Sequence, residues 1–336
     1  MTRVASIDIG TVTVRLAVAD VEGNDVARLA KQSRICDLGE GLSATGRLSE
    51  AARARVLAAV DDYLDAARKA GAAAVCCTLT SAARDASNSD VLLGSLAERG
   101  LVPEVIAGQV EGSLTFLGVA RDFVGERIVV ADNGGGSTEL AVGSLGSDGR
   151  LDLEFVRSVN VGCRRVTEKF LQRRDPPSAE DLEAAARFCR DGIGECVPWV
   201  AGSAVAGDAP VEKPARLVCV GGTVTSIVAI GAALEPYDSS FVHLHELTCA
   251  DIESVRDMLA QLTVGERAHV IGLQPKRAGV VLGGAVAVRE LMRATGFDRL
   301  TVSESDLLFG LSVAAAAAVA GGESPVGWLP IMVPLA

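Results

Sequence analysis

The sequence is poor in aromatic residues and has no excess of positive charge. Phe, Trp and Tyr together make up 4% of the 336 residues, and the formal net charge is −11. Proteins that bind single-stranded nucleic acid stack the bases on repeated aromatic side chains, and proteins that bind duplexes gather Lys and Arg on one face. The composition therefore argues against nucleic acid as a partner. A polyanionic substrate would need locally placed cations to overcome the negative charge of the chain.

Long apolar runs and metal-binding cysteine patterns are also missing. The longest apolar run near the C-terminus, residues 313–320, is far shorter than the roughly 20 residues that cross a bilayer. The N-terminus reaches Asp8 too early for the apolar core of a secretory signal. The eight cysteines form no C-x-x-C pair, so we expect buried free thiols. These features predict a cytoplasmic protein that has no membrane partner.

A glycine-rich segment lies between two apolar runs, residues 128–131 and 140–142, that we expect to be strands. It reads Asp132-Asn133-Gly134-Gly135-Gly136-Ser137-Thr138-Glu139. Glycines lack a Cβ, so their backbone N–H groups can approach an anion closely, and the Ser and Thr hydroxyls add donors. The carboxylates at both ends favour a phosphoryl group bound together with a divalent cation. An ordinary hairpin turn is the alternative.

The N-terminal segment has the same pattern as this glycine-rich segment. Asp8 precedes a turn, Gly10-Thr11-Val12-Thr13, between two expected strands. A plain hairpin is again the alternative, but the two segments resemble copies of one βββαβα pattern. The duplication predicts an α/β fold with two domains, residues 1–127 and 128–336, whose Asp-Gly turns face each other. A helix at about 304–320 would pack back on the first domain.

Other candidate residues follow expected strands, where ligands gather in α/β sheets. Arg84 follows the strand 74–78, and its alternative role is an ion pair with Asp85. Glu111 lies in the first turn of a helix, which the macrodipole alone would favour. The turn at residues 221–223 precedes a helix and is a third candidate phosphate contact.

Capping residues and breakers predict the remaining helices and one loop. Ser49 would begin a helix to residue 70, and Ser178 with Asp181 a helix to residue 200. Thr248 would begin a third helix, and residues 276–295 form a fourth. Residues 201–216 have the composition of a loop.

Five motifs carry a resemblance that extends over about residues 3–312. They are Asp8-Ile9-Gly10-Thr11, the segment 80–86, Gly108-x-x-Glu111-Gly112, the segment 132–139 and Val220-Gly221-Gly222-Thr223. In this order they resemble the Ppx/GppA family of exopolyphosphatases and guanosine pentaphosphate phosphatases. The resemblance implies the actin-like ATPase fold, with two ribonuclease H-like domains around a cleft. It also implies Mg²⁺-dependent release of the terminal phosphate from polyphosphate or guanosine pentaphosphate, in a short form without the C-terminal HD-type domain.

The resemblance assigns a role to each candidate residue. Glu111 would orient and deprotonate the attacking water. The metal ligands would be Asp8, Asp132 and Glu139, with Mn²⁺ as an alternative to Mg²⁺. The expected phosphate-binding residues are Gly10, Thr11, Thr13, Arg84, Gly134, Gly135, Gly136, Ser137, Thr138, Gly221, Gly222, Thr223, Arg267 and Arg277.

Several positions depart from the family pattern, which leaves other functions open. Val12 stands where the family has Asn, Val110 replaces an acid, and Leu308 and Phe309 replace an Arg-Glu pair. These changes favour, as an alternative, a weak or inactive member that binds polyphosphate or an alarmone as a sensor or scaffold. An ATP-dependent sugar or acetate kinase is a third hypothesis. The Ala-rich last helix suggests a homodimer.

Overall fold

The structure is a computed structural model that describes residues 1–23, 25–199 and 211–335. Most of the predicted loop at 201–216 lies outside the described residues. The chain forms two compact units, each described here by itself. Unit 1 comprises residues 1–126, 144–153 and 305–336, and unit 2 comprises residues 127–143 and 154–304. No helix in the described ranges is long and apolar enough to cross a membrane.

Unit 1 is built on a mixed sheet with the order β3-β2-β1-β4-β5, and β12 also pairs with β4. The first three strands are antiparallel neighbours, and β4 and β5 continue in parallel with β1. The strands are β1 (Thr2–Ile9), β2 (Thr13–Glu22), β3 (Asp25–Ile35), β4 (Ala74–Leu79), β5 (Pro103–Val105) and β12 (Val333–Pro334).

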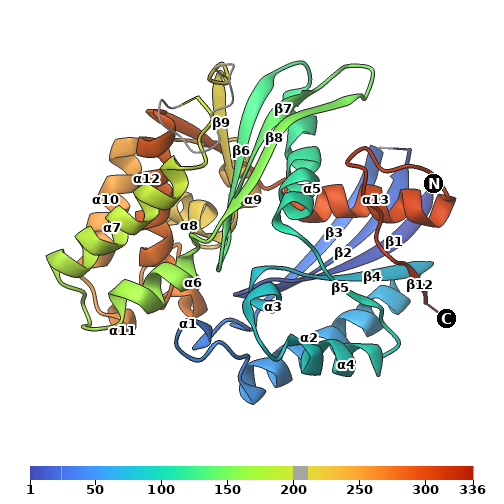
Figure 1. Cartoon of the computed structure of the whole chain (residues 1–336), viewed down its shortest axis with the longest axis horizontal. Coiled ribbons are helices and arrows are strands. Elements are labelled where there is room, and N and C mark those ends of the chain that lie inside the picture. Colours follow the sequence, from blue (N-terminus) through green and yellow to red (C-terminus); the bar gives the residue numbers. More distant parts are fainter. Residues whose placement is uncertain (24, 200–210, 336) are drawn as a thin grey trace. The chain divides into compact units, whose positions relative to one another are not determined.

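Helices cover both faces of this sheet, with α2 and α4 on one face and α5 and α13 on the other (Figure 1). The predicted cap at Ser49 is confirmed, because its side chain accepts a hydrogen bond from the Ala52 amide. The helices are α1 (Leu42–Thr45), α2 (Glu50–Lys69), α3 (Ser81–Asp85), α4 (Ser89–Ala97), α5 (Gly108–Ala120) with the 3-10 turn η1 (Arg121–Phe123), and α13 (Leu307–Ala320).

Unit 2 repeats the strand order of unit 1. Its sheet runs β8-β7-β6-β9-β11, with β10 added at the β11 edge. The strands are β6 (Arg127–Asn133), β7 (Thr138–Leu145), β8 (Leu151–Val159), β9 (Arg216–Val220), β10 (Glu246–Thr248) and β11 (Arg299–Val302). Three antiparallel strands followed by two parallel ones, found twice in one chain, are the ribonuclease H-like arrangement of the actin-like ATPase fold. The predicted fold class is confirmed.

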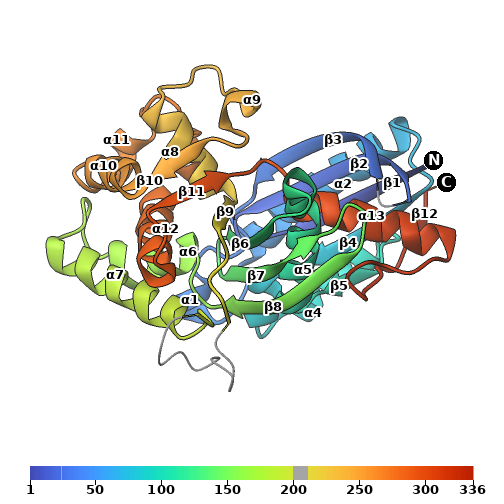
Figure 2. The same cartoon turned by 90° about the horizontal axis from the view of Figure 1, so that it is seen from above.

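The helices of unit 2 gather around α12, which packs against α6, α7, α8 and α10 (Figure 2). The capping boxes predicted from Ser178 and Thr248 are both present. The helices are α6 (Cys163–Val166) with the π-helical turn η2 (Thr167–Leu171), α7 (Ala179–Gly194), α8 (Gly222–Gly231), α9 (Ser239–Val242), α10 (Cys249–Ala260), α11 (Val264–Arg267), η3 (Pro275–Arg277) and α12 (Val281–Thr295).

Two helices are shorter than the sequence predicts. α7 ends at Gly194 rather than near residue 200, because Cys196 turns back to the Ile193 carbonyl and Pro198 lacks the N–H that would continue the helix. α12 begins at Val281 rather than near residue 276, because the segment from Pro275 closes its own 3-10 turn first.

A close packing of α5 against α13 joins the last helix to unit 1. Gly118 of α5 lies against the Asp306 carbonyl, and a Cβ at Gly310 of α13 would overlap the carbonyl oxygen of Leu114. Glycine at both positions lets the two helix backbones approach each other. The apolar helix α13 therefore buries its surface in unit 1, against α5, β1 and β2.

We expect the substitution Gly310→Ala to lower the free energy of unfolding by about 1–3 kcal/mol, because the added methyl group has no space. Urea denaturation measures the change. Gly94→Ala, in α4, is the matched control, because a Cβ there meets no atom within 4 Å. The control should be neutral or stabilising by about 0.4–1 kcal/mol. Equal effects of the two substitutions would contradict the packing argument.

Candidate active site

The first turn, between β1 and β2, has its carbonyl groups bound from behind. The Gly10 amide donates to the Thr13 carbonyl at 2.9 Å and closes the turn. The carbonyls of Thr11 and Val12 accept hydrogen bonds of 2.9 Å from backbone amides of residues 36–39, the segment that follows β3. Gly39 lies so close to the turn that a Cβ there would overlap the Thr11 side chain. The turn is therefore fixed by a segment of unit 1 that comes later in the chain.

The second turn, between β6 and β7, is held in the same way. The Gly134 amide donates to the Ser137 carbonyl at 3.0 Å. The carbonyls of Gly134 and Gly135 accept from the backbone amides of residues 163–165, which follow β8, at 2.8–3.2 Å. The Arg165 guanidinium adds a contact of 2.7 Å to the Gly136 carbonyl. The two turns thus share a hydrogen-bond pattern, as the predicted duplication requires.

Such turns present their amides to a ligand. Within the described ranges, the amides of Thr11, Val12, Gly135 and Gly136 donate no backbone hydrogen bond. Because the turn carbonyls are bound behind, these N–H groups are donors that an anion can use. Phosphate oxygens are suitable acceptors.

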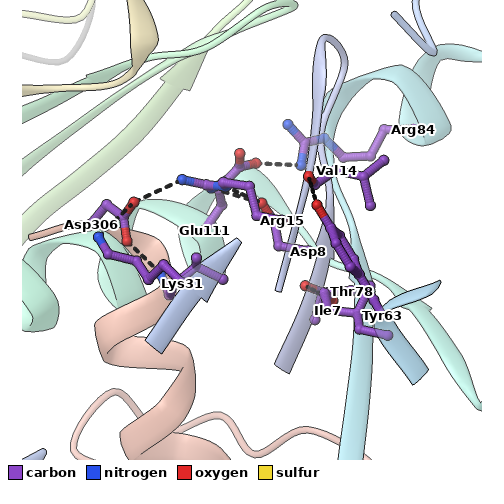
Figure 3. A network of polar contacts seen from close by, with 11 residues as sticks. Ile7, Asp8, Val14, Arg15, Lys31, Tyr63, Thr78, Arg84, Glu111 and Asp306 are labelled. Atoms are coloured by element: carbon purple, nitrogen blue, oxygen red, sulfur yellow. Dashed lines mark hydrogen bonds and ion pairs between the residues drawn. The ribbon is translucent and has the colours of Figure 1, made fainter. Parts of the chain in front are cut away.

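Asp8, at the end of β1, forms an ion pair that the sequence analysis did not predict. It pairs across the strands with Arg15, whose Nε and Nη2 donate to Asp8 Oδ2 at 2.9 and 2.7 Å (Figure 3). The other oxygen, Oδ1, has no hydrogen-bond partner among the described residues. Burial raises the pKa of Asp8 despite the arginine. Oδ1 is thus a buried acceptor available to a cation.

Arg15 also donates a hydrogen bond to Asp306, the residue that caps α13. Oδ2 of Asp306 lies 3.6 Å from Nζ of Lys31, on β3. Arg15, Lys31 and Asp306 are not among the residues predicted from the sequence. A local signal existed for Arg15 alone: in a hairpin closed by Gly10 and Thr13, strand pairing places it opposite Asp8.

Glu111 and Arg84 form the second ion pair of unit 1. Arg84, from α3, donates Nη1 to Glu111 Oε2 at 2.8 Å and to the Ile106 carbonyl at 2.8 Å. Arg84 thus forms a salt bridge with Glu111, which lies in the first turn of α5 (Figure 3). Glu111 is only 8% exposed. The arginine and the helix N-terminus both favour its carboxylate form.

In unit 2, the predicted turn at residues 221–223 lies against the end of β6. Gly221 has φ +105°, and a Cβ there would lie 2.7 Å from the Asn133 carbonyl and 3.2 Å from Asp132 Oδ1. A Cβ at Gly222 would overlap the guanidinium of Arg277. The structure therefore brings Asp132, Gly221, Gly222 and Arg277 together. Glycine at 221 is required by its positive φ and by the backbone approach, whereas a Cβ at 222 would displace the Arg277 guanidinium.

The remaining predicted residues of unit 2 have partners of their own. Glu139 accepts a hydrogen bond of 2.6 Å from the Ser158 hydroxyl. The Thr138 hydroxyl donates to the Val161 carbonyl, and Thr223 is buried. Arg267 is 4% exposed, and its Nε donates to the Leu259 carbonyl in the packing of α10 and α11. Burial lowers the pKa of Arg267. Its hydrogen bond thus ties Arg267 to α10, whereas Arg277 lies on the glycine turn.

The carboxylates fit the metal that the resemblance implies. Mg²⁺ is usually bound through one or two carboxylates together with water and substrate phosphates. Within the described ranges no group of three or more His, Cys, Asp or Glu side chains is arranged to hold a metal. Asp132 and Glu139, at the two ends of the glycine turn, could supply one or two oxygen ligands, and Asp8 Oδ1 is a buried acceptor without a hydrogen bond.

Comparisons with known proteins agree with this geometry. The model of the Ppx/GppA phosphatase family matches residues 17–314. Exopolyphosphatase 2 of Mycobacterium tuberculosis is 35% identical over 333 residues, which cover 94% of this chain and 99% of that protein. The crystal structure of an exopolyphosphatase-like protein matches with a TM-score of 0.82 at 30% identity, covering 93% of this chain and 97% of that one.

A second solved structure also matches over nearly the whole of both chains. The Ppx/GppA family member of Aquifex aeolicus matches with a TM-score of 0.74 and 28% identity, over 96% of this chain and 99% of that one. The family match and the relatives lead to one assignment. The chain belongs to the Ppx/GppA phosphatase family.

Proposed function

We propose that this protein is a Mg²⁺-dependent exopolyphosphatase that hydrolyses the terminal phosphoanhydride of inorganic polyphosphate or of guanosine pentaphosphate. The observation that carries the proposal is the Glu111 carboxylate, held by Arg84 at the start of α5. The names of the relatives support the reaction class, because they include exopolyphosphatases that cover nearly the whole chain.

Glu111 acts as the general base. Arg84 orients its carboxylate through the hydrogen bond to Oε2, and the carboxylate takes a proton from the attacking water. The water oxygen then bonds to the terminal phosphorus, and the bridging oxygen leaves with the electron pair of the broken P–O bond. Phosphoryl transfer needs mainly positioning and charge neutralisation, so one oriented base suffices.

The turns and the cations hold the phosphates. In unit 1, the amides of residues 11–12 are the donors for phosphate oxygens, and Asp8 is a candidate metal ligand. In unit 2, the amides of residues 135–136 are the donors, Arg277 adds charge beside the turn at Gly222, and Asp132 and Glu139 would hold Mg²⁺. When bound, the metal neutralises charge on the phosphate oxygens.

The substitution Glu111→Gln tests the base directly. We expect phosphate release from polyphosphate in the presence of Mg²⁺ to fall by about 10²- to 10⁴-fold, because glutamine cannot take the proton. A colorimetric phosphate assay measures the loss. Glu98→Gln, on an exposed residue of unit 1, is the control and should retain the activity of the wild type.

Two outcomes would count against this role. If Glu111→Gln retains full activity, Glu111 is not the base. If the wild type binds polyphosphate without releasing phosphate under any divalent metal, the protein binds the substrate as a sensor or scaffold instead of hydrolysing it.

The substitution Asp132→Asn tests the metal site. We expect the Mg²⁺ concentration for half-maximal activity to rise by about 10- to 100-fold, because an amide is a poorer ligand than a carboxylate. A metal titration of phosphate release gives this value. Asp152→Asn, on an exposed residue of β8, should leave the titration unchanged. An unchanged titration for Asp132→Asn would remove Asp132 from the metal site.

A further inference from the structure

We propose that Arg15 and Lys31 form a phosphate subsite beside the turn at Gly10–Thr13, and that Asp306 occupies this subsite until a polyphosphate chain displaces it. The inference rests on the proposed function, because it concerns how the same substrate is held. It assigns Lys31 to substrate binding and gives Asp306 the role of a competing anion.

Asp306 bridges a helix and two cations with one carboxylate. Its Oδ1 accepts a hydrogen bond of 3.0 Å from the Leu308 amide and so caps α13. Its Oδ2 accepts a hydrogen bond of 3.0 Å from Arg15 Nη1 and lies 3.6 Å from Lys31 Nζ. One oxygen therefore caps the helix, and the other pairs with both cations.

Of the two carboxylates on Arg15, Asp306 is the one that can yield. Asp8 is buried and holds Nε and Nη2 at 2.9 and 2.7 Å, so the guanidinium stays in place. The Asp306 contact is longer, and the side chains of Arg15, Asp306 and Lys31 are 22%, 16% and 30% exposed. A phosphate oxygen can therefore replace Asp306 Oδ2 while Arg15 remains oriented by Asp8.

The register of the sheet places the two cations on one face. Arg15 and Ala17 are two residues apart on β2 and share that face, and Lys31 of β3 pairs with Ala17. From these neighbouring positions the two side chains converge, because Arg15 Nη1 and Lys31 Nζ both contact Asp306 Oδ2, at 3.0 and 3.6 Å. Two cations that meet at one oxygen suit one phosphate group of the chain.

Lys31 is also held by more than one contact. Its Nζ lies 6.0 Å from the centre of the Phe309 ring, and Arg121 lies 5.6 Å from the same ring. The aromatic face keeps a cation in place after its carboxylate partner is displaced. Phe309 thus supports the subsite although its own side chain is apolar.

The decisive variant is Asp306→Asn, because asparagine keeps the helix cap while it removes the charge. We expect the KM for medium-chain sodium polyphosphate to fall by about 3- to 10-fold. Lys31→Met should raise this KM by a similar factor, with a smaller change in kcat. Asp20→Asn is the matched control, since Asp20 is another partly buried carboxylate of unit 1 paired with an arginine. Its KM should stay within about twofold of the wild type.

An unchanged or higher KM for Asp306→Asn would overturn the inference, and so would an equal fall in the Asp20→Asn control. Failure of the proposed function looks different, because the wild type would then release no phosphate. In that case, calorimetric titration with the same polyphosphate decides the inference alone. Tighter binding by Asp306→Asn and weaker binding by Lys31→Met would support it, and unchanged affinities would refute it.

Discussion

One constraint is common to the two units, which is that the carbonyls of the turns at residues 10–13 and 134–137 are bound from behind. In each unit, the segment after the third strand of the sheet donates backbone amides to these carbonyls, from residues 36–39 and from residues 163–165. A turn held in this way cannot rotate its peptide groups, so its own amides keep one direction. Gly39 and Gly162 are required behind the turns, because a Cβ at either would collide with the turn it supports.

The chain has a net charge of −11, yet arginines lie beside individual buried carboxylates. Each of the two key carboxylates of unit 1 is paired with an arginine, Asp8 with Arg15 and Glu111 with Arg84. Pairing with an arginine favours the ionised form of a carboxylate and fixes its orientation, although burial still raises the pKa of Asp8. It also holds the two arginines in defined positions. The same two ion pairs thus orient the carboxylate proposed as the base and the arginines proposed to contact phosphate.

The sequence predicted the features that depend on local patterns. Short segments of sequence are enough to predict glycine turns, helix caps and the repeated order of strands. The structure contains all three features. Contacts between distant segments were not predictable. Arg84 pairs with Glu111, 27 residues away, and Arg15 with Asp306, 291 residues away. Sequence also does not show that the Arg267 guanidinium is buried against α10.

The most direct test is a crystal structure of the Glu111→Gln variant with Mg²⁺ and tripolyphosphate, in which binding occurs without turnover. We expect phosphate oxygens within hydrogen-bond distance of turn amides at residues 11–12 or 135–136, with Arg15 turned from Asp306 to a phosphate. Ordered phosphates bound elsewhere, with both turns empty, would contradict this expectation.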